Sequence, residues 1–365
     1  MTDTLPAHPW QLAGKPPQPL SEAPWLAPRD AGALVHLFAA MPELRDVSLA
    51  QELGQALAQP SPPAVIMPHQ ATPTTTTDTA AAEADASEPL FKRPQAIVAL
   101  ADATLLVADR DRGLIHRLSP TGELIATFGA EAGLVAPMSI AARSDGSVVV
   151  ADFIASALCI FAPATGELVA KLQAAEVMMP KGCVELAGGD MVVSSYGSRR
   201  LVLWRRDDTF SNVELPASVQ ENFVPGALAV SPDRLTVYVQ NEQGTGGGRL
   251  GKDILAVRFD GNAAVVGVRP VVRDIMSEGL EVLPNGSLLV SCTVGCVIRH
   301  YSCDVNGEPI GVYGAGKGTE AAEYDYPVGL CAVPCGRVVV CDKRNQRLQV
   351  FTPAARERAS GAPAT

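Results

Sequence analysis

The chain has 365 residues, which is enough for two average domains or for one large repeat domain with extensions. Hydrophobic residues make up 47% of it, so a sizeable core is available, and its 32 glycines and 29 prolines are typical of a fold with many tight turns. A formal net charge of -10 excludes a general attraction for nucleic acid. No apolar run reaches the length of about 18 residues that a membrane-spanning helix needs.

The N-terminus lacks a basic segment followed by an apolar stretch, so we expect no secretory signal. A cytoplasmic protein with eight reduced cysteines is therefore expected. The pairs Cys292/Cys296 and Cys331/Cys335 lack the two-residue spacing of zinc knuckles. We predict buried thiols at these positions and no metal.

Both ends of the chain differ in composition from its centre. Residues 1–29 are rich in proline, which precludes long helices and strands, and we expect disorder there. Residues 30–58 carry apolar side chains at helical spacing and predict a pair of short helices. Residues 59–89 are a predicted linker, and residues 353–365 are a predicted disordered tail.

From residue 90 to residue 352 the pattern changes to short β-branched runs separated by turn dipeptides, and it repeats six times. Pro94, Pro137 and Pro180 open the first three units and are 43 residues apart. Four antiparallel strands in each of six units predict an all-β fold, a six-bladed β-propeller in which neighbouring sheets cover each other's faces. The predicted second strands are 105–109, 148–152, 191–194, 235–239, 288–291 and 338–342.

The sixth unit stops at its third strand, because Thr352-Pro353 and a polar tail follow. Its outer edge is therefore open, and open sheet edges are prone to aggregation. Ala64–Met67 is the best candidate for an upstream strand that completes the sheet, although a three-stranded sixth blade is the alternative.

Several positions repeat in phase with the strands. The second unit has Pro137, Asp145-Gly146 and Val150–Asp152, and the sixth has Pro327–Gly329 and Asn345–Phe351. In these features the units resemble NHL repeats, although the third and fourth units lack the aspartate after the second strand. The resemblance implies a propeller that serves as an interaction platform.

NHL proteins include tripartite-motif ubiquitin ligases, RNA-binding regulators and an amidating lyase. A ligase of this kind needs a RING domain with closely spaced zinc ligands, and residues 1–158 contain no cysteine. Intrinsic ligase activity is therefore excluded.

Asp109, Asp152 and Asp342 recur at one place, the end of the second strand. Such repetition favours a structural role, in which the carboxylate accepts hydrogen bonds from nearby backbone N–H groups in a turn.

In a propeller, the loop that leads into each blade and the loop between its second and third strands emerge on one face, here called the loop face. These loops are rich in cations and poor in acids, which suggests a docking surface for an acidic peptide or for RNA. The candidate face consists of Lys92, Arg93, Arg110, Arg112, Lys181, Tyr196, Arg199, Arg200, Lys343, Arg344 and Asn345.

We predict from this face a non-enzymatic scaffold whose partner is a protein or an acidic peptide. An RNA-binding regulator is an alternative, but the loops lack the interleaved aromatic residues on which single-stranded bases stack. Ordinary solvated loops are the third interpretation.

Two segments, Ala227–Asp233 and Glu278–Leu280, also resemble sugar-lactone hydrolases, which are six-bladed propellers. That resemblance implies one divalent metal held by Glu, Asn and Asp, and the matching positions are Gln95, Gly226 and Glu278. A hard cation needs more than one carboxylate. A metal-dependent lactonase is therefore an alternative only, and we predict no catalytic residue and no cofactor.

Overall fold

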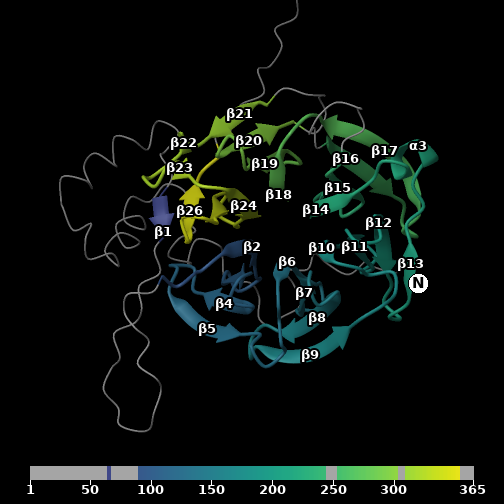
Figure 1. Cartoon of the computed structure of the whole chain (residues 1–365), viewed down its shortest axis with the longest axis horizontal. Helices are drawn as coiled ribbons and strands as arrows, with labels where there is room; N and C mark the ends of the chain where they lie inside the picture. Colours follow the sequence, from purple (N-terminus) through teal and green to yellow (C-terminus); the bar gives the residue numbers. More distant parts are fainter. Residues whose placement is uncertain (1–63, 67–88, 244–252, 303–308, 354–365) are drawn as a thin grey trace, which may run out of the picture.

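The computed structural model of the chain describes residues 64–66, 89–243, 253–302 and 309–353. In this part, six four-stranded antiparallel sheets stand around a common axis like the blades of a propeller (Figure 1). The predicted all-β, six-bladed β-propeller is therefore confirmed. The predicted Pro-rich segment 1–29 and helical pair 30–58 lie outside the described residues, as does the tail beyond 353.

The first five blades each run in chain order from the innermost strand to the outermost strand. Blade 1 contains β2 (Pro94–Ala99), β3 (Leu105–Asp109), β4 (Leu114–Leu118) and β5 (Leu124–Phe128). Blade 2 contains β6 (Pro137–Ala142), β7 (Val148–Asp152), β8 (Ala157–Ala162) and β9 (Glu167–Leu172). Blade 3 contains β10 (Pro180–Glu185), β11 (Met191–Ser195), β12 (Arg200–Trp204) and β13 (Phe210–Asn212).

Blade 4 contains β14 (Pro225–Val230), β15 (Thr236–Asn241), β16 (Asp253–Phe259) and β17 (Val265–Val272). Blade 5 contains β18 (Ser277–Val282), β19 (Leu288–Cys292), β20 (Val297–Tyr301) and β21 (Gly311–Tyr313). Between blades lie the short helix α3 (Ala217–Gln220) and the parallel pair β22 (Gly316–Lys317) and β23 (Glu323–Tyr324).

Blade 6 combines strands from the two ends of the chain. It contains β24 (Pro327–Ala332), β25 (Val338–Asp342), β26 (Arg347–Phe351) and, as its outermost strand, β1 (Ala64–Ile66). Ala64 pairs with Val350 and Ile66 with Leu348, so β1 covers the edge of β26 (Figure 1). The sixth blade thus has four strands, and β1 falls within the segment that the sequence analysis considered for this position.

The second strand of a blade is buried on both sides. Every residue of β3, β7, β11, β19 and β25 is buried, whereas β5 and β9 at the rim are largely exposed or half-buried. A strand covered on both faces carries a continuous apolar run instead of an alternating one. This explains why runs such as Val148–Ala151 marked the repeat so clearly.

The core of the molecule is divided among the interfaces between blades. Six clusters of buried hydrophobic side chains occur in the described residues, one at each interface. Leu106 of blade 1, for example, shares a cluster with Val148 of blade 2. Because no blade buries its faces alone, the ring of blades is the folding unit.

Pro94 at the start of β2 pairs with Asp109 at the end of β3, which places the leading loop and the loop between the second and third strands on the same side. This is the loop face. The turns between first and second strands, and between third and fourth strands, lie on the opposite side, here called the turn face. No helix in the described ranges is long and apolar enough to cross a bilayer.

Candidate functional site

Three aspartates at the ends of second strands hold the loop face together. Asp109 accepts hydrogen bonds from the backbone N–H groups of Lys92 and Arg93, at 2.7 and 2.9 Å. Asp152 and Asp342 each accept an equivalent bond, at 2.8 Å, from the leading loops of blades 2 and 6. Each carboxylate therefore ties the leading loop of its blade to the end of the second strand.

Blades 3 and 4 use other residues for the same purpose. The Ser195 hydroxyl accepts the N–H of Met178 at 2.8 Å, and the Asn241 side-chain oxygen accepts the N–H of Val224 at 2.9 Å. Neither residue was predicted, because the repeat was recognised by a shared aspartate and not by the shared position at the end of the second strand. Serine and asparagine can occupy that position because any short side chain with an acceptor oxygen can accept the backbone hydrogen bond.

Three cations converge on the loop face where blades 6 and 1 meet. Lys343 is only 5% exposed. Burial, together with the nearby guanidinium groups of Arg93 and Arg110, lowers the pKa of the Lys343 ammonium to about 8, although Glu278 acts in the opposite direction. Its Nζ lies 3.6 Å from the Glu278 carboxylate and 4.9 Å from the centre of the Tyr326 ring. We call Arg93, Arg110 and Lys343 the cation cluster.

A second lysine has a similar environment. Lys181 forms an ion pair with Glu242, and its Nζ lies 4.8 Å from the centre of the Tyr196 ring. Each lysine is therefore placed between a carboxylate and a tyrosine ring, where a cation is stabilised by both. Glu242 and Glu278 were absent from the predicted face, and they neutralise part of its charge.

Other predicted face residues are bound by their neighbours. Arg112 donates hydrogen bonds to the backbone carbonyls of Pro89, at 3.0 Å, and Leu90. Arg199 donates to the side-chain oxygen of Gln243 at 2.6 Å. These contacts hold loops together, so the two guanidinium groups are already engaged.

The C-terminal part of the predicted face is engaged as well. Asn345 donates a hydrogen bond to Asp342 at 2.8 Å. Arg344 lies 3.5 Å from Asp325, and its guanidinium is 4.6 Å from the centre of the Tyr326 ring. Within the described ranges, Arg110, Arg199 and Arg200 are the predicted arginines that have no carboxylate within ion-pair distance.

An apolar patch occupies the loop face over blades 2 and 3. Val135, Ile154, Met178 and Met179 are 51%, 61%, 47% and 37% exposed. Val135 is bonded to Asp152, two residues before Ile154, and the N–H of Met179 is bonded to the Ser156 hydroxyl at 3.1 Å. These side chains therefore belong to adjoining loops, and the sequence analysis did not select them.

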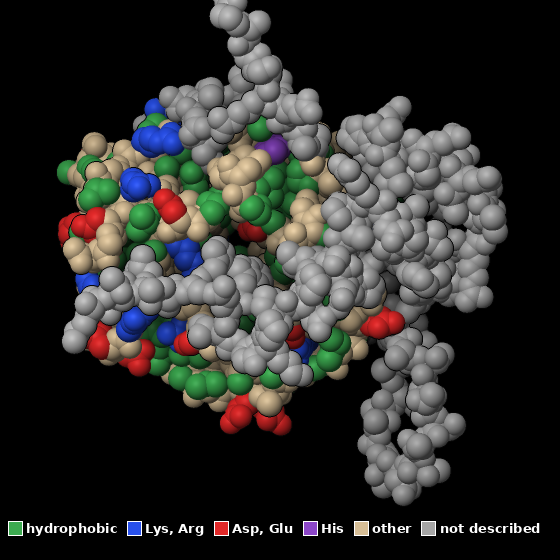
Figure 2. Space-filling model, turned by 180° about the vertical axis from the view of Figure 1, so that it is seen from behind, with side chains coloured by type: hydrophobic (Ala, Val, Ile, Leu, Met, Phe, Trp, Pro, Cys, Tyr) green, Lys and Arg blue, Asp and Glu red, His purple; other side chains and the backbone are tan. Residues whose placement is uncertain are grey.

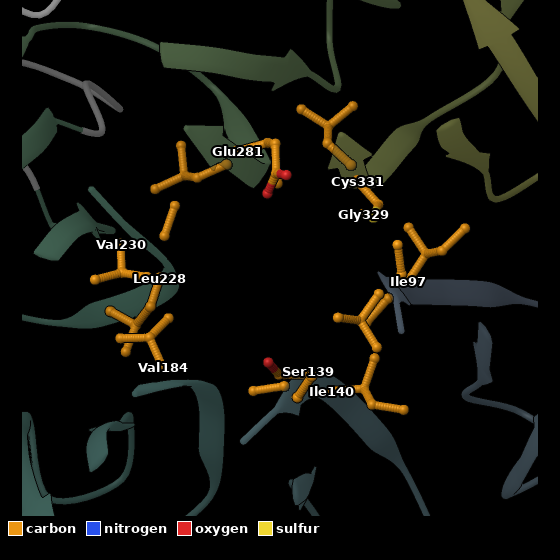
Figure 3. Close-up of a pocket in the computed structure, with 18 of the residues that line it drawn as sticks. Ile97, Ser139, Ile140, Val184, Leu228, Val230, Glu281, Gly329 and Cys331 are labelled. Atoms are coloured by element: carbon orange, nitrogen blue, oxygen red, sulfur yellow. The ribbon is translucent and has the colours of Figure 1, made fainter. Parts of the chain in front are cut away.

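A channel runs through the centre of the ring, between the innermost strands β2, β6, β10, β14, β18 and β24. Its volume is about 1300 Å³, and aliphatic side chains such as Ile97, Ile140 and Leu228 form most of its wall (Figure 3). Hydrophobic side chains also gather around the central hollow of the face seen in Figure 2, with charged side chains scattered around them. The channel is thus apolar over most of its wall, and its charged lining residues are Asp102, Lys181, Glu185, Arg234, Glu278 and Glu281.

Small residues let the innermost strands approach one another beside this channel. A Cβ added to Gly279 would lie 1.9 Å from the carbonyl oxygen of Val328, and one added to Gly329 would lie 2.8 Å from that of Gln95. A larger residue at either position would push neighbouring blades apart. The glycine two residues after the start of β18 and of β24 therefore has a packing reason.

Three glutamates interrupt the apolar wall, and one of them, Glu278, is the carboxylate that pairs with Lys343. Glu185 of β10 accepts hydrogen bonds from the N–H and hydroxyl of Ser144, at 2.9 and 2.8 Å, and pairs with Arg234 at 2.5 Å. Glu281 of β18 accepts the N–H of Ala332 at 2.8 Å, and its carboxylate points toward the open centre of the channel (Figure 3). Burial raises the pKa of Glu281 to about 7.

The comparison with protein families finds one match, the NHL repeat, at residues 324–351 of blade 6. The chain is a six-bladed β-propeller with an NHL repeat. No curated protein sequence matches this NHL-repeat propeller. The matched segment contains Tyr326, Lys343, Arg344 and Asn345 of the loop face.

Solved structures share the fold at low sequence identity. A virginiamycin B lyase from Staphylococcus aureus is 12% identical with a TM-score of 0.52, and covers 72% of this chain and 96% of that one. A gluconolactonase from Xanthomonas campestris is 14% identical with a TM-score of 0.55, and covers 72% and 86%. An auxiliary nutrient binding protein from Bacteroides thetaiotaomicron is 10% identical with a TM-score of 0.55, and covers 72% and 69%. The shared fold thus occurs in enzymes and in binding proteins.

The positions matched to the lactonase metal site do not suit a hard cation in this chain. Glu278 accepts a hydrogen bond from the Tyr326 hydroxyl at 2.7 Å and pairs with Lys343. Gly226 has no side chain, and a Cβ there would lie 2.6 Å from the side-chain oxygen of Gln240. The described residues contain no group of three His, Cys, Asp or Glu side chains that could hold a metal. Oxygen ligands of the required number and charge are not gathered there.

Proposed function

We propose that this propeller is a non-enzymatic interaction protein that docks an acidic peptide segment of a partner protein on its loop face. The observation that carries the proposal is the cation cluster. Arg93, Arg110 and Lys343 are close enough to lower the pKa of the lysine, and the carboxylates paired with them are Asp111 and Glu278. Three cations beside two anions leave a local excess of positive charge that an acidic side chain would neutralise.

Arg110 is the residue best placed to contact a partner. Its backbone N–H is bonded to the carbonyl of Arg93, which fixes its position at the end of β3, while its guanidinium has no partner within the described ranges. A guanidinium of this kind can bind a carboxylate through two parallel hydrogen bonds. An aspartate or glutamate of the partner is therefore the expected contact.

The apolar patch over blades 2 and 3 favours a peptide, and not an isolated anion, as the binding partner. Its four exposed side chains lie on the same face as the cation cluster, and peptide interfaces combine an apolar centre with a polar surround. A segment with acidic residues followed by apolar residues would engage both regions. Methionines such as Met178 and Met179 adapt to different apolar side chains.

The proposal is tested by selecting peptides from a random display library and measuring the affinity of the selected sequences. We expect enrichment of Asp or Glu together with apolar residues, and a loss of about ten-fold in affinity for Arg110→Glu, since one charge-assisted contact becomes repulsive. Arg206→Glu on the turn face is the matched control, and its affinity should equal that of the wild type.

Two outcomes would contradict the proposal. One is the selection of peptides without acidic residues, whose affinity Arg110→Glu leaves unchanged. The other is preferential binding of single-stranded RNA with a steep salt dependence, which would favour the nucleic-acid alternative.

A further inference from the structure

The central channel has the size and composition of a small-molecule site. Binding pockets for small molecules commonly measure about 300–1,000 Å³ and are mostly apolar with a few polar groups. The channel of about 1300 Å³ is large enough, and Ile97, Ile140, Val184 and Leu228 supply an aliphatic wall (Figure 3). An apolar molecule inside it would be removed from water on most sides.

Glu281 is a carboxylate in this wall that lacks a cation. Its hydrogen bond comes from the backbone N–H of Ala332, and no lysine or arginine in the described part of the chain forms an ion pair with it. The raised pKa of Glu281, about 7, reflects the cost of leaving the ionised carboxylate in an apolar environment. A positively charged group on a bound ligand would stabilise the ionised carboxylate.

Gln95 supplies a second acceptor that lacks a donor. Its side chain is only 3% exposed, and it lines the channel at the start of β2. Its side-chain oxygen is buried without a hydrogen-bond partner among the described residues. The Gln95 oxygen is closed off from the channel, so Glu281 is the acceptor that a ligand can reach. A hydrogen-bond donor satisfies that carboxylate, whereas an anion would add a further acceptor.

We propose that the central channel binds an organic cation, a molecule with an apolar body and a protonated amine, whose ammonium group pairs with Glu281. The aliphatic wall contacts the body of the ligand. This site adjoins the loop-face surface proposed for a protein partner, because Lys181 and Glu278 also line the channel. The two proposals depend on different residues, since the ammonium contact is made by Glu281 and the peptide contact by Arg110.

The test uses octylammonium chloride, octanol and sodium octanoate as probes, titrated into the full chain at pH 8 by calorimetry. The three probes share one alkyl chain and differ in charge. We expect octylammonium to bind about ten-fold or more tightly than octanol and octanoate, because the first probe alone carries a positive charge and forms an ion pair with the carboxylate. In Glu281→Gln the affinity for octylammonium should fall about ten-fold, to that of octanol.

Arg110→Glu is the control, and it should leave the octylammonium affinity unchanged while it weakens peptide binding. Glu281→Gln should do the reverse, so the two proposals fail independently. Equal affinity for the three probes, binding of none of them, or an unchanged octylammonium affinity in a folded Glu281→Gln variant would each overturn the proposal.

Discussion

Glu185 of blade 3 and Glu281 of blade 5 both lie in the wall of the central channel, and the two carboxylates have opposite surroundings. Glu185 in blade 3 receives two hydrogen bonds from Ser144 and an ion pair from Arg234. Glu281 in blade 5 receives one backbone N–H, from Ala332. The two positions differ in how completely the protein itself compensates the buried charge.

This difference separates a structural carboxylate from one that is available for binding. A buried charge with a full set of partners stabilises the fold only while those partners remain, and a buried charge without them is destabilising. Glu185 thus joins blades 2, 3 and 4 through its contacts with Ser144 and Arg234. Glu281 is half-buried and has one backbone donor, so its carboxylate retains acceptor capacity that a ligand in the channel could use.

The largest change in the free energy of unfolding is expected when Glu185, like Glu281, has no cation beside it. Arg234→Met removes the guanidinium and leaves a carboxylate whose side chain is 3% exposed without its cation. We expect the free energy of unfolding at pH 7 to fall by about 3 kcal/mol, as for one half of a buried ion pair. Chemical denaturation measures this change, and adding Glu185→Gln to the variant should restore most of it. A loss below about 0.5 kcal/mol would mean that Ser144 alone satisfies the carboxylate.

The second substitution, at Glu281, is expected to raise the free energy of unfolding instead of lowering it. The pKa of Glu281 in the folded protein, about 7, lies above the ordinary value of 4.5 for a glutamate, so folding favours the protonated form. Its contribution to stability is present below pH 4.5 and is lost as the pH rises through 7. Glu281→Gln should therefore stabilise the protein by about 2 kcal/mol at pH 8 and by little at pH 4.5. Thermal unfolding at both pH values measures this difference, and an equal gain at both would contradict the assignment.

A smaller effect is expected from the hydroxyl that helps to compensate Glu185. Ser144→Ala removes the hydroxyl donor and keeps the backbone N–H, so the carboxylate retains two of its partners. The free energy of unfolding should fall by about 1 kcal/mol. Equilibrium unfolding in urea is sufficient to detect it, and Ser147→Ala on the same turn serves as a comparison.

The smallest effect is expected on the loop face. The Arg344 side chain is 53% exposed, and its ion pair with Asp325 is screened by water. Arg344→Ala should change the free energy of unfolding by less than about 0.5 kcal/mol. A larger loss, measured in the same denaturation series, would show that stacking on Tyr326 stabilises blade 6 more than surface pairs usually do.

The fold could be predicted from sequence because its signals are local and repeated. Val148–Asp152 and Val338–Asp342 are continuous buried strands, and turn pairs such as Asp145-Gly146 precede several of these strands. Each signal spans fewer than about ten residues and recurs in the other blades. Six independent repetitions of one pattern are strong support for a propeller.

The site was less predictable because its chemistry depends on residues far apart in the chain. Lys181 pairs with Glu242, 61 residues away, so its cationic loop could not be recognised as partly neutralised. Glu281 stands in an ordinary strand sequence, and its environment comes from the innermost strands of other blades. Local spacing carries no information about either relationship.

The pairing of residues 64–66 with 348–350 also sets the order of events during synthesis. The ribosome releases β1 before any other strand of the propeller and β26 after all of them. Pairings this distant in sequence form slowly. The nascent chain therefore exposes an unfinished sheet edge until β26 has been synthesised, and a chaperone that shields such edges during this interval would raise the yield of native protein.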